Sequence, residues 1–163
     1  MKNTTLLLLL AMVFVLAAIG LSFSVVLQQA PTGPLPTTFT VANKTFYITA
    51  YAVTTAQQEK GLMNRTVSNN TFMLFVFNST SQYSFWMKDT YTPLDMIWIN
   101  SHNSTGTVVY IVNATPCSSY DPNQTACDIY TPASPANYVI ETRSGFAQRY
   151  GLTVGEKIYF NFS

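Results

Sequence analysis

The longest hydrophobic stretch of the chain covers residues 6–27, and no charged residue occurs between positions 4 and 43. A helix of about 22 residues spans roughly 33 Å, which is enough to cross a bilayer. We favour an uncleaved signal anchor over residues 1–27, because the apolar run continues past the small-residue cleavage motif Ala18-Ile19-Gly20. A cleaved signal peptide is the alternative.

Lys2 is the only charge near the hydrophobic stretch, and it lies on the N-terminal side. The positive-inside tendency therefore predicts a cytoplasmic N-terminus, with the rest of the chain outside the cell membrane. We therefore expect a single-pass membrane protein that contacts the bilayer through its N-terminal helix. Cleavage would instead give a secreted protein, so both alternatives export the C-terminal part.

Residues 28–38 contain Pro31, Gly33, Pro34 and Pro36 and show no apolar periodicity. Prolines at this density cannot continue a helix, so we expect a semi-extended linker rich in Pro and Thr. Residues 39–163 then form a segment long enough to bury a core of its own. This segment is predicted to be one extracellular domain.

Alternation of apolar and polar residues dominates the C-terminal segment and predicts short strands. The predicted strands cover residues 45–53, 71–77, 83–87, 94–100, 107–112, 138–142 and 156–160. A capping box at Thr55 and Gln58 predicts a short helix ending at Gly61, and a second helix is expected at residues 144–150. The fold class is therefore mainly β, a compact antiparallel β-sandwich or barrel-like domain with two short helices.

Composition agrees with an exported domain, since 48% of residues are apolar and only 9% are charged. Polar Asn, Ser and Thr residues replace the missing charges and form repeated Asn-x-Ser/Thr glycosylation motifs. The eight predicted acceptors are Asn43, Asn64, Asn69, Asn78, Asn103, Asn113, Asn123 and Asn161. Cys117 and Cys127 are the only cysteines, and in an exported chain we expect them to form a disulfide.

The formal net charge is only +1, so no basic field exists to attract nucleic acid. His102 is the only histidine and no CxxC motif is present, which argues against a zinc site and against a cysteine nucleophile. We therefore expect no metal and no cofactor. The oligomeric state is left open by the sequence.

Several short motifs occur together and in order along residues 52–156. They are Glu59-Lys60-Gly61-Leu62-Met63, Met73-Leu74-Phe75-Val76-Phe77, the block at residues 85–95, Asn137-Tyr138-Val139-Ile140-Glu141 and Gly151-Leu152-Thr153-Val154-Gly155-Glu156. In combination they resemble domain-of-unknown-function family 192. The resemblance implies a small, mainly β domain and suggests no particular reaction.

The block at residues 85–95, FWMKDTYTPLD, carries three of the few charges of the domain. Trp86 and Met87 are expected in the core, as strand-end aromatics usually are. Asp95 precedes an apolar run and is costly to bury without a partner. One hypothesis gives Asp95 a structural role, as an ion pair or turn cap that holds residues 61–65 against the sheet.

The second hypothesis is a pocket for a small polar or anionic ligand, to which five residues would contribute. Arg65 would bind the anion as a fork, Lys88 would add charge, Asp95 would accept a hydrogen bond and Trp86 would form an apolar wall beside Glu141. Ligand binding is our best functional prediction. A surface scaffold without a pocket is the first alternative.

A hydrolase that uses Asp95 and Glu141 as paired carboxylates is the second alternative. Such a mechanism requires the two groups to share an open cleft at a set separation. The sequence contains no Ser-His-Asp arrangement, phosphate loop or nucleotide fingerprint. The catalytic residues, if any, are unknown, and we consider a binding protein more plausible than an enzyme.

Overall fold

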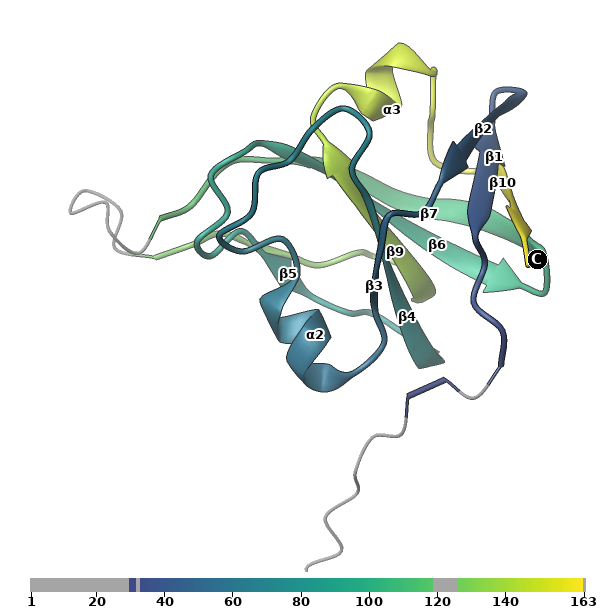
Figure 1. Ribbon diagram of the computed structural model, residues 1–163, viewed down its shortest axis with the longest axis horizontal. Coiled ribbons are helices and arrows are strands. Elements are labelled where there is room, and N and C mark those ends of the chain that lie inside the picture. Colours follow the sequence, from purple (N-terminus) through teal and green to yellow (C-terminus); the bar gives the residue numbers. More distant parts are fainter. Residues whose placement is uncertain (1–29, 32, 119–125, 163) are drawn as a thin grey trace, which may run out of the picture.

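The computed structural model describes residues 30–31, 33–118 and 126–162. These residues form an eight-stranded sheet with the order β2-β1-β10-β7-β6-β9-β4-β3, and a separate two-stranded sheet of β5 and β8. All strand pairs are antiparallel except β3 with β4. The fold is mainly β with two short helices, as the sequence predicts (Figure 1).

Four of the predicted strands are longer than expected, the strand predicted at residues 83–87 is shorter, and the one predicted at residues 156–160 is shifted by one position. The strands are β1 Thr38–Val41, β2 Lys44–Tyr47, β3 Ala50–Ala52, β4 Phe72–Ser81, β5 Phe85–Trp86, β6 Leu94–His102, β7 Thr105–Ala114, β8 Ile129–Tyr130, β9 Ala136–Arg143 and β10 Lys157–Asn161. The helices are α2 Thr55–Lys60 and α3 Phe146–Arg149. Strands β1 and β8 are additional to those predicted.

The large sheet curls into a half-barrel because its two edge strands are almost continuous in the chain. The predicted single strand at residues 45–53 is in fact β2 followed by β3, separated only by Ile48 and Thr49. The Ile48 N–H donates to Thr37 O at 2.9 Å, and the Thr49 N–H donates to Phe72 O at 2.9 Å. These two residues therefore link opposite edges of the large sheet. The barrel-like form of the prediction is closer to the structure than the sandwich, because eight strands curl into one sheet and only β5 and β8 form a second, smaller one.

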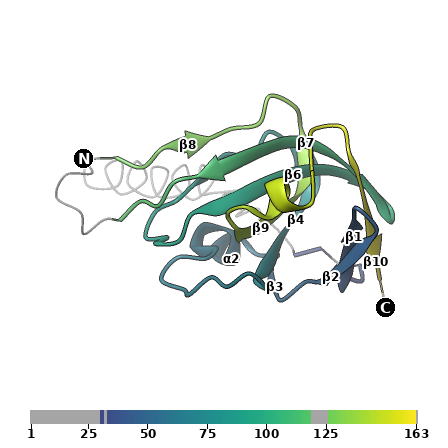
Figure 2. The same cartoon turned by 90° about the horizontal axis from the view of Figure 1, so that it is seen from above.

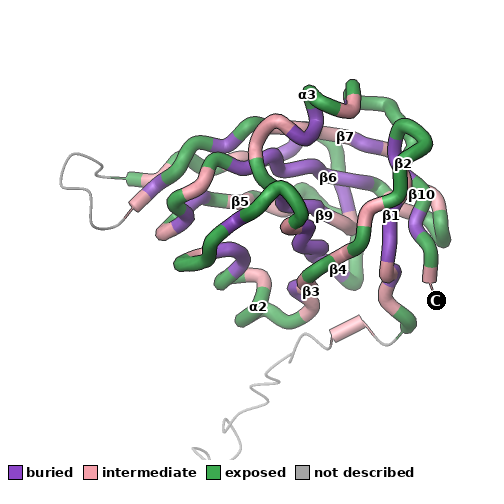
Figure 3. The backbone as a smooth tube through the Cα atoms, turned by 45° about the horizontal axis from the view of Figure 1, so that its top comes forward, coloured by how far each residue is buried: buried purple, intermediate pink, exposed green. Residues whose placement is uncertain are grey.

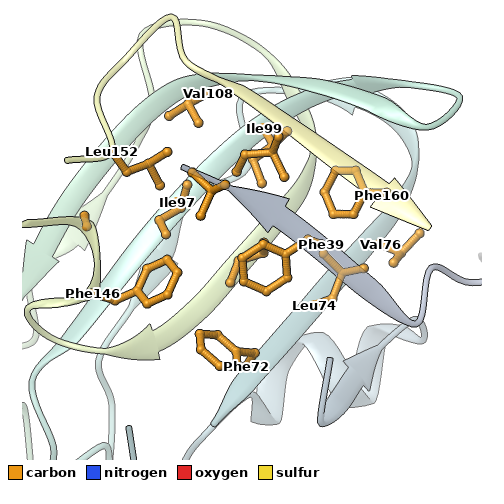
Figure 4. Packing of buried hydrophobic residues seen from close by; sticks show 14 residues of the cluster. Phe39, Phe72, Leu74, Val76, Ile97, Ile99, Val108, Phe146, Leu152 and Phe160 are labelled. Carbon is orange, nitrogen blue, oxygen red and sulfur yellow. The ribbon is translucent and has the colours of Figure 1, made fainter. Parts of the chain in front are cut away.

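One core fills the inside of the curl (Figure 4). Phe39 of β1 lies 5.3 Å from Phe72 of β4 between ring centroids, although five strand positions separate β1 from β4 in the sheet. Phe46 and Phe146 complete this aromatic group, at 5.3 Å and 6.1 Å from Phe39. The aromatic group therefore closes the half-barrel by packing its distant strands together.

A second core lies on the opposite face of the central strands and includes Met73, Phe75, Met96, Trp98 and Val139. Burial is concentrated in β4, β6 and β9, whose residues are covered on both faces (Figure 3). β1, β2 and β10 lie at one end of the molecule, while α2 lies toward the other (Figures 1 and 2). The segment that follows β3 thus covers the second core, where Leu62 and Val67 are buried.

The capping box of helix α2 lies one residue earlier than the sequence pattern predicted. The N-cap is Thr54, whose side chain accepts from the Gln57 N–H, while the Gln57 side chain accepts from the Thr54 N–H. The prediction of Thr55 and Gln58 was therefore wrong by one position. Gly61 terminates the helix as predicted, with a φ of 44°.

The end of the predicted linker contacts the domain. Leu35 packs against the inner core, and Pro36 O accepts a hydrogen bond of 2.8 Å from the Tyr51 hydroxyl. Strand β1 begins at Thr38. The predicted N-terminal anchor or signal peptide lies outside the described residues, and within the described part no helix is long and apolar enough to span a bilayer.

The cysteines and most predicted glycosylation sites lie within the described residues. Cys117 and Cys127 form a disulfide with a Cα–Cα distance of 5.6 Å. Seven acceptor asparagines are exposed, namely Asn43, Asn64, Asn69, Asn78, Asn103, Asn113 and Asn161. Asn123 lies outside the described residues.

Candidate functional site

A pocket of about 300 Å³ opens beside α2 on the face of the sheet that carries the second core. We call it the α2–β5 pocket. Its floor comes from β4 and β9, and its walls come from α2, the turn after α2, β5 and the segment that precedes β5. Five aromatic residues line it: Phe75, Phe77, Tyr83, Phe85 and Trp86. The lining is thus largely apolar, and the volume lies at the lower end of the range of roughly 300–1,000 Å³ typical of ligand pockets.

Glu141 is the acidic residue in the floor of the pocket. It lies on β9 between β4 and β6, directly opposite Met73 and Met96. Only 4% of its surface is exposed, and its Oε2 atom has no hydrogen-bond partner. A buried polar group without a partner is costly, which makes such a group a candidate for contact with a ligand.

Burial raises the pKa of Glu141 to about 8, because its apolar surroundings disfavour the charged carboxylate. The carboxyl group is therefore mainly protonated at neutral pH. It can then donate one hydrogen bond and accept others. Perturbed acids in pockets of this kind are frequent at functional sites.

Gly61 allows the chain to pass close to the pocket floor. Its φ of +44° favours glycine, and a Cβ atom there would lie 3.2 Å from Phe75 Cζ and 3.5 Å from Glu141 Oε2. A side chain at this position would therefore occupy space next to the carboxyl group. Glycine at this position therefore leaves the carboxyl group and the Phe75 ring uncrowded.

Ring packing holds the aromatic walls in place. Phe85 contacts Phe75 and Trp98 edge to face, at centroid distances of 4.8 Å and 5.3 Å. Phe77 stacks on Tyr83, and the Trp98 indole N–H donates to Tyr83 O at 2.9 Å. Because Phe75, Phe77, Tyr83 and Phe85 pack against one another and against Trp98, these parts of the pocket are preformed.

Of the five residues proposed from the sequence, Trp86 and Glu141 line this pocket. Trp86 is 44% exposed, so the expectation that it packs in the core was wrong, whereas Met87 is buried as expected. The core tryptophan is Trp98 instead. Arg65 and Lys88 are both exposed and do not line the pocket, but the Lys88 Nζ atom lies 5.4 Å from the centre of the Trp86 ring.

Asp95 points to the opposite face of the sheet from Glu141. In the register of β6 with β9, Asp95 pairs with Thr142 and Met96 pairs with Glu141, so the two acids occupy adjacent positions of opposite orientation. Asp95 is buried and accepts hydrogen bonds of 2.8 Å from Asn113 Nδ2 and from the Ala147 N–H in α3. The expected convergence of Asp95 with Glu141 does not occur, and the two do not form a carboxylate pair.

Asp95 therefore has a structural role, as one hypothesis from the sequence expected, but it holds α3 and not residues 61–65. It fixes the first turn of α3, while other groups hold residues 61–65. The Asn64 N–H donates to Asp89 O at 2.8 Å, and the Tyr91 hydroxyl donates to Asn64 Oδ1 at 2.7 Å. Main-chain and neutral side-chain groups thus anchor the turn after α2.

Comparison with known proteins places this architecture in a family. Residues 37–160 match the family DUF192, described as "Uncharacterized ACR". The chain belongs to the DUF192 family. Comparison with curated proteins gave no match.

Two solved structures are similar to this DUF192 domain over most of its length. A protein of unknown function from Novosphingobium aromaticivorans is 30% identical with a TM-score of 0.61, over 77% of this chain and 84% of that one. A Sinorhizobium meliloti protein, whose description suggests a transcription regulator, is 31% identical with a TM-score of 0.62, over 80% and 97% of the two chains. These similarities support the fold and leave the activity open.

Sequence reasoning missed most of the walls of the pocket in this DUF192 domain. Phe75, Phe77 and Phe85 follow the pattern of ordinary core residues, so no local signal separates them from the core. Glu141 did carry a signal, since it directly follows the apolar pair Val139-Ile140 in a predicted strand. Among the described residues, no group of three His, Cys, Asp or Glu residues is arranged to hold a metal ion.

Proposed function

We propose that this DUF192 domain binds a small organic molecule in the α2–β5 pocket, outside the cell. The observation that carries the proposal is the buried Glu141 Oε2 atom, which lacks a protein partner and lies in the floor of an aromatic pocket. A ligand with an apolar body and one polar group would fill the pocket and satisfy this atom. Arg65 and Lys88 lie outside the lining, so of the polar or anionic ligand expected from the sequence we propose only the polar alternative.

Titration with benzyl alcohol, followed by NMR of the ¹⁵N-labelled domain, tests this proposal. We expect saturable shifts of the Gly61, Phe75 and Trp86 signals, because these residues line the pocket. Thr55→Trp should abolish the shifts by filling the mouth, whereas Thr66→Trp, an exposed substitution outside the lining, should leave them intact. Absence of pocket shifts at millimolar benzyl alcohol would overturn the proposal.

An extracellular location is supported by two features. The acceptor asparagines that the structure describes are all exposed, and the cysteines form a disulfide of a kind that persists in oxidising compartments. Protease treatment of intact cells tests the location. The domain should be digested without lysis; protection until the cells are lysed would contradict it.

Surface assembly is a second candidate, favoured by the exposed apolar groups of Trp86 and Ile129 at the pocket. Light scattering of the purified domain should show concentration-dependent association under this alternative. Nucleic-acid binding, which the description of the Sinorhizobium meliloti protein would suggest, is not proposed. The near-zero net charge of this chain gives such binding little electrostatic support.

A further inference from the structure

We propose that the ligand of the α2–β5 pocket is a small organic cation whose ammonium group pairs with the carboxylate of Glu141. This inference rests on the proposed binding function and adds the chemical class of the ligand. It follows from three features of the pocket: an unpartnered acid, a wall of aromatic rings, and the position of the basic residues.

The first feature is the acid itself. Glu141 is nearly completely buried, and its Oε2 atom receives no hydrogen bond from the protein. An ammonium group supplies both the opposite charge and the N–H donors that a carboxylate needs in an apolar site. An anionic ligand would face this same carboxyl at close range and would be disfavoured.

The second feature is the aromatic wall. Rings attract cations to their faces, and Phe75, Phe85 and Trp86 all line the cavity above Glu141. Trp86 already attracts an ammonium group from within the chain, since the Lys88 Nζ atom lies 5.4 Å from its ring centre. An aromatic site with a buried carboxylate thus matches an ammonium group better than it matches a neutral or negative polar group.

The third feature is the distribution of charge around the pocket. The other titratable residues in the lining are Glu59 and Lys60 on α2 and Tyr83 before β5. Glu59 and Lys60 are exposed, and neither side chain donates a hydrogen bond to the Oε2 atom of Glu141. Neither residue therefore satisfies the Oε2 atom, which leaves that role to a cation bound in the pocket.

Proton release should accompany binding. Burial raises the pKa of Glu141 to about 8 in the empty pocket, so at lower pH the carboxyl must lose its proton before it pairs with a cation. The affinity for an amine should consequently rise between pH 6 and 8, by up to about tenfold per pH unit. A neutral ligand should show no such dependence.

Calorimetry at pH 8 with benzylamine, benzyl alcohol and benzoate tests the ligand class, because the three probes share one ring and differ in charge. We expect benzylamine to bind at least about tenfold more tightly than benzyl alcohol, and benzoate to bind most weakly. Equal or weaker binding of benzylamine would overturn this inference while leaving the binding function intact. Failure of all three probes would overturn both proposals.

Glu141→Gln keeps the size of the side chain and removes its charge. It should reduce benzylamine affinity at least about tenfold and abolish the pH dependence, while benzyl alcohol affinity changes little. Glu156→Gln, which removes an exposed acid outside the pocket lining, is the matched control and should behave as the unmodified protein. Unchanged amine binding in folded Glu141→Gln would refute the pairing.

Discussion

Two buried acids, Asp95 and Glu141, have different roles in this domain because their hydrogen-bond partners differ. Asp95 and Glu141 each lie beside apolar residues in a central strand, and both are buried. Asp95 receives hydrogen bonds from Asn113 and Ala147, which satisfy its carboxylate within the protein. The Oε2 atom of Glu141 receives none, and this difference makes Glu141 the residue on which the binding proposal depends.

Glu141 should also make stability depend on pH. Burial raises its pKa to about 8 in the folded protein, against an ordinary value of 4.5, so the unfolded chain loses the proton at lower pH than the folded one. The stability associated with the protonated acid is complete below pH 4.5 and is lost as pH rises toward 8. Relative to Glu141→Gln, the native protein should lose on the order of a few kcal/mol between pH 5 and 8.

Urea unfolding of the two proteins at several pH values measures this difference. The unfolding free energy of Glu141→Gln should be flatter with pH than that of the unmodified protein. Parallel pH profiles would show that Glu141 does not carry a raised pKa.

Asn113 illustrates a conflict between a surface motif and a structural role. Its Nδ2 atom donates to Asp95 Oδ1 and to Ser144 Oγ, so Asn113→Ala would leave a buried carboxylate short of a donor. We expect a loss of about 2–3 kcal/mol of unfolding free energy, in line with hydrogen bonds to charged groups. Asn69→Ala, at another exposed acceptor, should change stability by less than about 0.5 kcal/mol.

The same atom is the attachment point for a glycan, so a sugar on Asn113 would remove one of these donors. Chemical denaturation of both variants tests the structural role. Equal stability of the two would contradict it.

At the scale of the element, α2 acts as one wall of the pocket and depends on its N-terminal cap. Thr54→Ala removes the acceptor for the Gln57 N–H and should cost about 1 kcal/mol. Thr55→Ala, one position later, should have an effect below about 0.5 kcal/mol. Thermal unfolding of the two variants tests which residue caps the helix. A larger loss of stability in Thr54→Ala supports the observed capping box, and a larger loss in Thr55→Ala would support the one predicted from the sequence.

Helix α2 is also too short to be stable on its own, since isolated helices below about 12 residues are marginal in water. It stays in place because Gln58 Nε2 donates to Val76 O at 3.0 Å and because the following Leu62 is buried. The pocket wall is therefore a consequence of docking on β4. Hydrogen exchange measures this dependence. The amide protons of α2 should exchange faster in Thr54→Ala than in Thr55→Ala.

At the scale of the whole molecule, closure of the half-barrel joins the two ends of the sheet. Phe39 is fully buried and contacts rings from β2, β4 and α3. Phe39→Ala should therefore cost about 3–5 kcal/mol, the range for truncating a buried phenylalanine. Tyr47→Ala on neighbouring β2 removes an aromatic residue that is 75% exposed and should cost less than about 0.5 kcal/mol.

Equilibrium unfolding of the two aromatic variants provides the measurement. A small effect of Phe39→Ala would mean that the edge strands contribute little to the folded domain. A loss confined to Phe39→Ala would support closure by the inner aromatic group.

The sequence by itself determined most of the strands, the two short helices, the cysteine pair and the family to which the chain belongs. These features depend on local alternation, capping residues and short motifs, all of which are readable within a few positions. The split of residues 45–53 into β2 and β3 escaped prediction because the alternation of burial continues through Ile48 and Thr49 while the partner strand changes. Partner strands are distant in the chain and leave no local signal.

Only the tertiary structure decided which acid faces the pocket. β6 and β9 are central strands with apolar residues on both faces, so the alternation that would separate inside from outside is absent. Their long-range register sets Asp95 against Thr142 and Glu141 against Met96. That register turns one acid toward α3 and leaves the other beneath the aromatic pocket.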